Sequence, residues 1–222
     1  MTTRPAKTVA GLHLIAGFIV FATMTLTLWQ ISEGIRDREP LTITDARLSS
    51  WLHTHHTPPM TTAMFAITAL GSTLVVSSIA VAFGIYFISR RRFHWLTAFM
   101  SSVFGGMLLN RLLKYAFHRP RPFFDNPLLT LTGYSFPSGH TMMATVLYGV
   151  TAAYLISKTR AWRLRILIVL VAASLILLVG FSRIYLGAHY LSDVIGAMAE
   201  GLAWLSLCLA VVFSICRQRT SR

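Results

Sequence analysis

Acidic residues are scarce in this chain of 222 residues, where seven Asp and Glu stand against twenty Lys and Arg. Charged residues make up only 12% of the sequence, whereas hydrophobic residues make up 55% and the mean hydropathy is +0.62. Soluble domains carry about 25% charged residues, so the composition indicates a membrane protein. The basic residues occur in short clusters between apolar segments, as membrane topology requires, and we therefore expect no nucleic-acid partner.

Cysteine is nearly absent. Cys208 and Cys216 lie in the same apolar segment, where eight helical residues would separate them by about 12 Å, too far for a disulfide. Cysteine therefore indicates nothing about catalysis. The amino-terminal run after Arg4 and Lys7 resembles a signal peptide, but it is too long and lacks a small-residue cleavage site. We interpret it as an uncleaved membrane span.

Six apolar segments are long enough, some marginally, to cross a bilayer core, which takes about 20 helical residues. They are residues 8–31, 62–89, 95–117, 139–157, 164–182 and 190–215. No internal repeat separates the chain into similar halves. We therefore predict an all-α polytopic membrane protein with six transmembrane helices, in which residues 1–222 form a single domain.

The clusters of Lys and Arg predict the orientation of these spans. The clusters at 4–7, 90–92, 158–165 and 217–222 fall on one side if the six spans alternate. The positive-inside rule makes that side cytoplasmic, so both termini are expected there. The loops 32–61, 118–138 and 183–189 then open on the outer face. We expect a multi-pass protein of the plasma membrane with its site facing the periplasmic or extracellular side.

The 32–61 loop contains a further helical pattern. Thr44 and Asp45 could cap a short helix that runs through His56, with Leu48, Trp51 and Leu52 on one face. Such a helix would lie at the membrane interface over the entrance to the site, or it would be an ordinary amphipathic connector.

The first candidate motif joins the third span to the following loop. Lys114 lies at the outer end of that span, and the pairs Arg119-Pro120 and Arg121-Pro122 follow. The prolines end the helix, while Arg offers a planar fork to phosphate oxygens and Lys a point charge. The alternative is that these basic side chains only reach to lipid headgroups.

The second motif opens the fourth span. Ser138 is a good N-cap, Gly139 allows a ligand to approach the backbone, and His140 lies in the first helical turn after Pro137. The free N–H groups at a helix start bind anions, and a protonated histidine there can protonate a leaving group. An ordinary serine cap beside an interfacial histidine would show the same pattern.

The third motif joins the last two spans. Ser182-Arg183 closes the fifth span, and His189 and Asp193, four residues apart, share one helix face at the start of the sixth. A carboxylate that accepts the Nδ1 proton leaves Nε2 free as a nucleophile. A metal site and a structural hydrogen bond are alternatives, although no further carboxylates accompany the pair.

These three motifs resemble those of the type-2 phosphatidic acid phosphatase family, the integral-membrane lipid phosphate phosphatases related to vanadium haloperoxidases. The family pattern KxxxxxxRP, PSGH and SRxxxxxHxxxD matches residues 114–122, 137–140 and 182–193 at every position. The six-residue spacer selects Arg121 over Arg119. The expected six spans with an outer site also agree with the family, so the resemblance covers most of the chain.

The resemblance implies a role for each matched residue. His189 attacks phosphorus and becomes a phosphohistidine, Asp193 orients it, and His140 protonates the leaving group and then activates water. The resemblance further implies phosphate binding by Lys114, Arg121, Ser138, Gly139 and Arg183, with no metal and no other cofactor. The expected reaction is dephosphorylation of a lipid phosphate or pyrophosphate, such as phosphatidylglycerophosphate or undecaprenyl pyrophosphate, at the outer leaflet.

Two other functions use the same residues. A phosphohistidine could pass its phosphoryl group to a lipid acceptor, which would make the protein a phosphotransferase. The site could also bind a lipid phosphate without catalysis in a binding or transport protein. Transporters usually bind at the midplane between repeated halves, whereas these charges gather at one face.

Two further groups of residues have separate interpretations. Glu200 and Arg111 each lie deeper than the motifs on their spans, and we predict that they form a buried ion pair that pins the spans together. His53, His55 and His56 form a candidate metal cluster, but histidines this close in a short loop are more often solvated.

Overall fold

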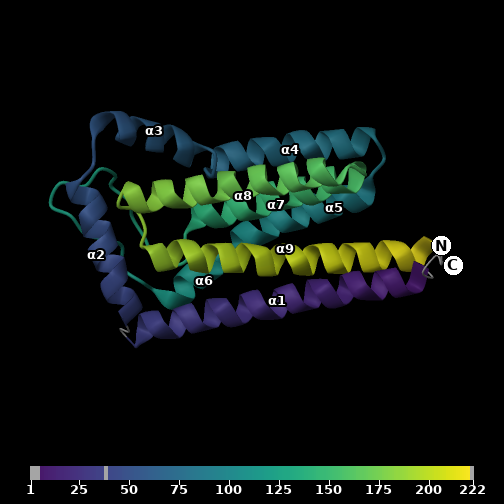
Figure 1. Ribbon diagram of the computed structural model, residues 1–222, viewed down its shortest axis with the longest axis horizontal. Coiled ribbons are helices and arrows are strands. Elements are labelled where there is room, and N and C mark those ends of the chain that lie inside the picture. The colour runs from purple at the N-terminus through teal and green to yellow at the C-terminus, as the bar shows by residue number, and fades with distance from the viewer. Residues whose placement is uncertain (1–5, 38–39, 221–222) are drawn as a thin grey trace.

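The computed structural model of the chain describes residues 6–37 and 40–220, with side chains described from residue 15 to residue 214 apart from 38 and 39. Residues 4 and 222 therefore lie outside the described part, as do the side chains of Lys7, Cys216, Arg217 and Arg219. All regular secondary structure of the described residues is helical, as predicted. Most helices run side by side in an elongated bundle, and one short helix crosses an end of it (Figure 1).

The first half of the bundle contains four helices. They are α1 (Ala6–Arg36), α2 (Pro40–Thr54), α3 (Pro58–Ala69) and α4 (Thr73–Ser89). The predicted span 62–89 is thus broken in the middle, at Gly71 and its neighbours. A Cβ on Gly71 would lie 2.7 Å from the carbonyl oxygen of His140 and 2.6 Å from Cγ1 of Val179, so only glycine allows this close approach. Ser72 restarts the helix by accepting a hydrogen bond from the Val75 N–H at 3.3 Å.

The second half begins with a continuous helical segment whose middle is a π-helical turn. The segment consists of α5 (Phe93–Met100), the π-helix η1 (Ser101–Gly105) and α6 (Gly106–Phe117). The Trp204 indole N–H donates to the Ser101 carbonyl at 3.1 Å, and a Cβ on Gly105 would lie 2.6 Å from the Trp204 ring. The π turn therefore lies where a large ring from the last helix packs against the backbone.

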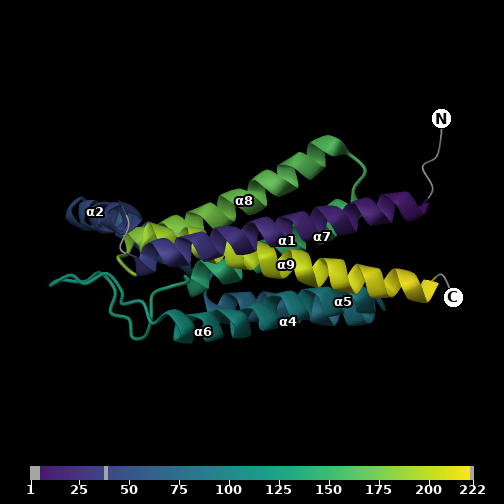
Figure 2. The same cartoon turned by 90° about the horizontal axis from the view of Figure 1, so that it is seen from below.

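Three long helices complete the bundle: α7 (Gly139–Lys158), α8 (Trp162–Tyr185) and α9 (Leu191–Thr220). α9 packs along α1, and α7 packs against both α8 and α9. α1 begins and α9 ends at the same end of the bundle, opposite the end that α2 crosses (Figures 1 and 2).

Five helical segments in the described residues are long and apolar enough to cross a membrane. They are Ile15–Arg36, Pro58–Ser89, Phe93–Phe117, Trp162–Tyr185 and Leu191–Ser214. The chain is therefore a multi-pass membrane protein. α7, which corresponds to the predicted span 139–157, is not among the five. Its polar residues, such as Thr141 and Thr145, are buried against neighbouring helices. α7 therefore tolerates a less apolar sequence than a lipid-facing helix does.

α2 differs from its predicted form. It begins at Pro40 and ends at Thr54, so Thr44 and Asp45 do not cap it, and Asp45 is instead buried within the helix. Leu52 is buried against the ends of α8 and α9, whereas Trp51 is 57% exposed and stacks on His55. The two residues predicted to share a face therefore lie on different sides of α2.

The predicted ion pair between Arg111 and Glu200 is wrong. Arg111 is exposed on α6, and Glu200 is buried and accepts a hydrogen bond from the Asn110 side-chain amide at 2.8 Å. Asn110, the residue next to Arg111 on α6, thus faces α9, because successive residues of a helix are rotated by about 100° about its axis. A neutral amide, rather than a cation, joins the two helices at this depth.

Candidate active site

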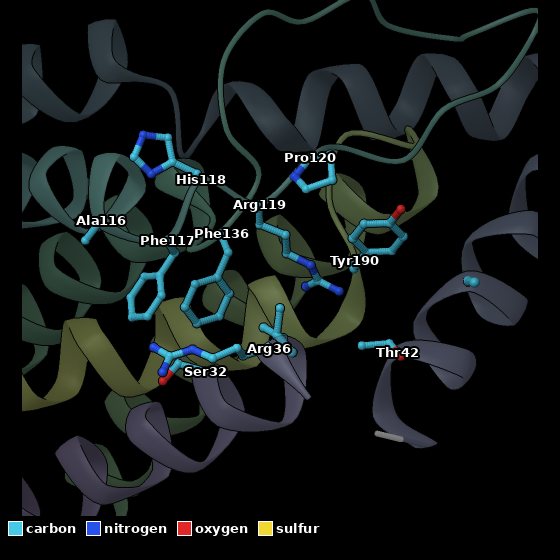
Figure 3. A pocket seen from close by; sticks show the side chains of 12 residues that line it. Ser32, Arg36, Thr42, Ala116, Phe117, His118, Arg119, Pro120, Phe136 and Tyr190 are labelled. Carbon is cyan, nitrogen blue, oxygen red and sulfur yellow. The ribbon is translucent and has the colours of Figure 1, made fainter. Parts of the chain in front are cut away.

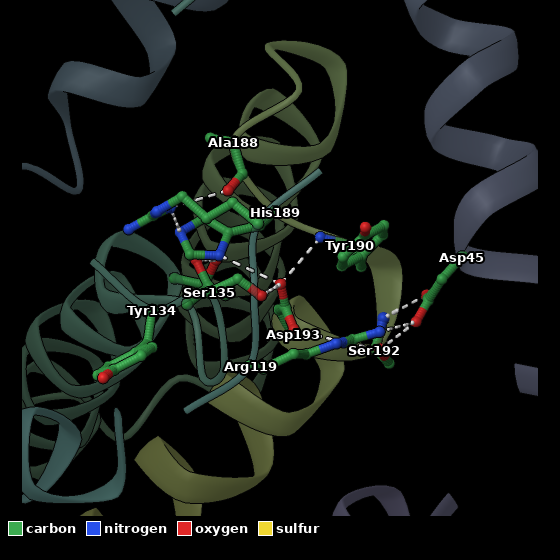
Figure 4. A network of polar contacts seen from close by, with 12 residues as sticks. Asp45, Arg119, Tyr134, Ser135, Ala188, His189, Tyr190, Ser192 and Asp193 are labelled. Atoms are coloured by element: carbon green, nitrogen blue, oxygen red, sulfur yellow. Dashed lines mark hydrogen bonds and ion pairs between the residues drawn. The ribbon is translucent and has the colours of Figure 1, made fainter. Parts of the chain in front are cut away.

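The three sequence motifs come together at the end of the bundle that α2 crosses. Lys114 lies in the last turn of α6, Gly139 begins α7 and Arg183 lies in the last turn of α8. His189 and Asp193 lie in the connection to α9 and in its first turn. Because four helix ends meet here, residues far apart in the sequence form one group (Figure 4).

His189 and Asp193 are both buried, and the histidine Nδ1 lies 3.3 Å from Oδ2 of the carboxylate. The same Oδ2 accepts hydrogen bonds from the Tyr190 backbone N–H at 2.9 Å and from the Ser135 hydroxyl at 2.8 Å. The bond to Tyr190 resembles half of a capping box, in which an acidic side chain at the third helical position accepts from the N-cap N–H. Asp193 thus both caps the start of α9 and contacts the His189 ring.

Arg121 defines the tautomer of His189. Its NH1 lies 3.3 Å from Nε2 of the histidine and also donates to the Ala188 carbonyl at 2.8 Å. A guanidinium can only donate, so Nε2 must be the unprotonated nitrogen and Nδ1 carries the proton directed at Asp193. The lone pair of Nε2 therefore points to the place where Arg121 would hold an anion.

Burial keeps His189 neutral. It lies in the short connection between α8 and α9, and desolvation lowers its pKa to about 3, although the neighbouring Asp193 opposes that shift. The cations Arg183 and Lys114 lower the pKa further. A neutral imidazole is the form that can act as a nucleophile.

Three cations act on His189 and have no carboxylate partner within the described residues. Lys114 donates to the carbonyls of Tyr134 and Ser135 at 3.0 and 3.2 Å, and Arg183 donates from NH1 to the Thr68 hydroxyl at 2.9 Å. The Nε of Arg183 is buried and makes no hydrogen bond within the described residues. A buried donor without an acceptor is costly, so this N–H is available to an oxyanion. None of Lys114, Arg121 and Arg183 forms an ion pair within the described part of the chain.

The start of α7 supplies further donors. Ser138 occupies the N-cap position, but its side chain makes no capping bond, and its hydroxyl accepts from Thr141 at 3.0 Å. The backbone N–H of Ser138 donates to the Asp193 carbonyl at 3.1 Å, which joins α7 to α9. The N–H groups of residues 139–141 precede the first intrahelical bond, which the Met142 N–H donates to the Ser138 carbonyl at 3.0 Å. With the helix dipole, such free N–H groups favour the binding of an anion.

His140 lies in the first turn of α7, where the charges of Arg183, Arg121 and Lys114 act on it. It is half-buried, and its side chain makes no hydrogen bond to another described residue. It is therefore free to contact a bound molecule.

Sequence reasoning missed Arg119 and Asp45. The motif spacing selected Arg121 and left Arg119 without a role, yet its NH1 lies 2.5 Å from Oδ1 of Asp193. Its NH2 lies 2.8 Å from Oδ2 of Asp45, and only 8% of its side chain is exposed. Asp45 was predicted only as a candidate helix cap, because nothing in the sequence shows which residue of α9 a carboxylate on α2 will face.

A cavity of about 420 Å³ lies beside Arg119, between α1, α2 and the end of α6 (Figure 3). Ser32 and Arg36 line it from α1, and Phe117 and Phe136 from the opposite side. His189 and His140 do not line it. The cavity therefore adjoins the ion-pair network but does not contain the histidine pair.

The described residues contain no group of three or more His, Cys, Asp or Glu side chains that could bind a metal. In the candidate cluster of the 32–61 loop, His53 stacks on Phe124 with ring centroids 4.0 Å apart, and His55 stacks on Trp51. These rings pack against aromatic side chains and do not converge on a common point.

Comparisons with known proteins agree with the motifs. The family model of the PAP2 superfamily matches residues 95–216. The chain is 35% identical over 149 residues to phosphatidylglycerophosphatase B of Bacillus subtilis, covering 65% of this chain and 71% of that protein. It is 30% identical over 153 residues to an undecaprenyl-diphosphatase of the same organism, covering 67% of this chain and 72% of that protein.

A solved structure agrees with the fold as well. The crystal structure of a transmembrane PAP2-type phosphatidylglycerolphosphate phosphatase from Bacillus subtilis matches with a TM-score of 0.78 at 27% sequence identity. The match covers 89% of this chain and 96% of that one. The similarity therefore extends over most of the chain, beyond the three motifs.

Proposed function

Because this chain belongs to the PAP2 superfamily and is a lipid phosphatase like its relatives, we propose that it works through a phosphohistidine formed on His189. The observation that carries the proposal is the environment of this side chain. Nδ1 faces Asp193, while the unprotonated Nε2 faces the guanidinium of Arg121. A phosphate bound by Arg121 would meet the lone pair of the nucleophile directly.

In the first step, Nε2 of His189 attacks phosphorus and the bond from phosphorus to the leaving oxygen breaks. His140 donates its proton to that oxygen, so the product leaves as an alcohol or a lipid monophosphate. A bound phosphate dianion stabilises the protonated form of His140 through its opposite charge. Lys114, Arg121 and Arg183, with the N–H groups at the start of α7, stabilise the equatorial oxygens as charge redistributes.

In the second step, water attacks the phosphohistidine. His140, now neutral, accepts the proton of the attacking water, the P–N bond breaks and its electron pair returns to Nε2 of His189. Asp193 holds the Nδ1 proton in both steps, so the same tautomer is restored. The products are inorganic phosphate and the original enzyme.

We propose that this chemistry needs no metal ion. The charge that a metal would supply to phosphate is provided by three cations without carboxylate partners in the described residues. Activity in excess chelator is the direct test.

We propose a lipid phosphate or lipid pyrophosphate as the substrate. The names of two relatives give phosphatidylglycerophosphate and undecaprenyl diphosphate as the first candidates. Both carry phosphate on an apolar tail. The site suits such molecules, because its residues lie at the ends of membrane-spanning helices such as α6 and α8, at headgroup depth.

We propose that α7 is a sixth span and that the site opens on the periplasmic or extracellular side of the plasma membrane. α7 runs along the bundle and packs against α8 and α9. The site lies at one end of the bundle and the start of α1 at the other (Figure 1). Arg90–Arg92 and Lys158–Arg165 lie at the end away from the site, which the positive-inside rule assigns to the cytoplasm. Labelling of single cysteines at positions 91 and 126 from outside intact cells tests this: only the second should react.

The test of the phosphohistidine is phosphate release by the purified chain in detergent, with excess chelator and with His189→Ala alongside. We expect release from a panel of lipid phosphates, loss of release in the variant, and a phosphoenzyme that is stable in alkali but labile in acid. His55→Ala is the control, because His55 lies outside the site. Activity retained by His189→Ala would contradict the proposal.

The same assay distinguishes the alternative functions. A phosphorylated product formed from added lipid acceptors, in place of free phosphate, would indicate a phosphotransferase. Folded protein that binds but does not turn over any member of the panel would indicate a binding or transport protein.

A further inference from the structure

We infer that Arg119 and Asp45 are positioning residues that hold the Asp193 carboxylate in the orientation required by His189, and that they link α2 to the active site. The inference rests on the proposed role of His189 as nucleophile. Neither Arg119 nor Asp45 belongs to the three motifs, and neither contacts the site that we assign to phosphate.

The two oxygens of Asp193 have different partners. Oδ2 accepts from Ser135 and Tyr190 and faces His189, whereas Oδ1 accepts only from Arg119 within the described residues. The carboxylate is fully buried. Without Arg119, Oδ1 would lack a donor, and the carboxylate would gain by rotating toward other donors. The guanidinium therefore determines which way Asp193 turns toward His189.

Arg119 is itself fixed from several sides (Figure 4). Its NH2 donates to Asp45 at 2.8 Å, its NH1 donates to the Ser192 hydroxyl at 2.7 Å, and its guanidinium carbon lies 4.4 Å from the centre of the Tyr190 ring. Ser192 also donates to Asp45, through its backbone N–H at 3.0 Å and through its hydroxyl. Asp45 thus anchors α2 to the first turn of α9, next to Asp193.

The charges of this network do not balance. Two buried carboxylates, Asp45 and Asp193, share the single guanidinium of Arg119. Replacing Arg119 with a neutral residue leaves two buried negative charges close together, which is more costly than removing the charge of Asp45 alone. Loss of the Asp45 charge should therefore partly compensate for loss of Arg119.

Arg119 and His189 approach Asp193 from different sides, as Figure 4 shows. Changes at Arg119 should therefore alter the orientation of the nucleophile without weakening the binding of phosphate by Lys114, Arg121 and Arg183. A lowered kcat with an unchanged KM follows from such a role. A loss of overall stability would reduce only the amount of folded enzyme.

The experiment is steady-state hydrolysis of dioctanoyl phosphatidic acid by the purified full chain in detergent, with inorganic phosphate as the competing ligand. The variants are Asp45→Asn, Arg119→Lys, Arg119→Gln and the double variant Asp45→Asn with Arg119→Gln. Arg111→Gln is the matched control, since Arg111 is an exposed cation on the neighbouring α6. Rates are normalised to the monodisperse protein recovered by size exclusion.

We expect kcat to fall about 100-fold in Arg119→Gln and about 10-fold in Asp45→Asn, as displacement of a catalytic group by about 1 Å produces. KM and the inhibition constant of phosphate should stay within about twofold. Arg119→Lys should retain more activity than Arg119→Gln, because it keeps the charge, and the double variant should be more active than Arg119→Gln alone.

Wild-type kcat in either Asp45→Asn or Arg119→Gln would overturn the inference, as would a loss of phosphate affinity in parallel with kcat. If Arg119→Gln does not fold, Asp45→Asn and Arg119→Lys decide by the same criteria. His189→Ala in the same series separates the two proposals. Activity in that variant contradicts the phosphohistidine, whereas its inactivity beside a fully active Arg119→Gln overturns only the present inference.

Discussion

NH1 of Arg121 lies 3.3 Å from Nε2 of His189, and the same NH1 also donates to the carbonyl of Ala188. The backbone next to the histidine thus fixes the guanidinium that faces it. On the function proposed above, a phosphate held by this fork would be positioned by the loop that carries His189, so a movement of the loop would move both groups together.

Arg121→Lys should therefore reduce kcat/KM by about 100-fold, because an ammonium keeps the charge but loses the planar fork that contacts Ala188 and that we propose binds phosphate. Arg111→Lys, on an exposed face of α6, should have no effect. Initial rates across substrate concentrations measure both. A fully active Arg121→Lys would show that charge alone is sufficient at this position.

The lowered pKa of His189 predicts how stability depends on pH. In the unfolded chain, the imidazole of His189 binds a proton below about pH 6.5. In the folded chain, the same imidazole stays neutral until the pH falls to about 3. Stability should therefore be fully present above pH 6.5 and should decrease as the pH falls toward 3.

The measurement is the Tm in detergent at a series of pH values, for the wild type and for His189→Gln. The slope between pH 6.5 and 4 should be smaller in the variant, because it lacks this proton-binding site in the unfolded state. Equal slopes in the two proteins would contradict a neutral, buried His189.

Gly71→Ala should lower both stability and activity. The new Cβ would lie 2.7 Å from the carbonyl oxygen of His140, so the break between α3 and α4 and the start of α7 must move apart. Overpacking of this kind costs about 1–3 kcal/mol. Gly17→Ala is the matched control, since its Cβ would meet Ala210 at an ordinary 3.7 Å. Equal Tm values for the two variants would show that the α3–α4 break adjusts freely.

Glu200→Gln should be tolerated, because glutamine keeps an oxygen that accepts from Asn110 and places no charge in the buried site. Glu200→Ala should be less stable by about 1–3 kcal/mol, since it leaves the Asn110 amide without its acceptor. Thermal unfolding in detergent distinguishes these outcomes. If Glu200→Gln loses activity while its Tm is unchanged, Glu200 contributes more than a link between helices.

The sequence predicted the helical membrane fold and placed the motif residues at helix ends, because apolar segments and fixed spacings are properties of neighbours along the chain. It did not predict the break at Gly71, which depends on how closely α7 and α8 approach. It predicted Arg111 as the partner of Glu200, whereas the partner is Asn110. Packing decides how α6 is rotated about its axis relative to α9, and the sequence pattern does not contain that information.

Arg119 and Asp45 were missed for a related reason. The family pattern selected the residues that we propose to act on phosphate, whereas Arg119 contacts Asp193. Asp45 meets Ser192 of α9 because α2 crosses the end of the bundle (Figure 1). Contacts of this kind become visible only in three dimensions.

The position of Asp45 also bears on how such an enzyme can be recombined. The family model begins at residue 95, so Asp45 lies in the part of the chain that it does not describe. A chimera that joins the first ninety residues of one relative to the remainder of another would contain every motif residue. It would still replace the residue that faces Arg119 from α2, so on the role inferred for Asp45 the interchangeable unit is larger than the segment that the family model matches.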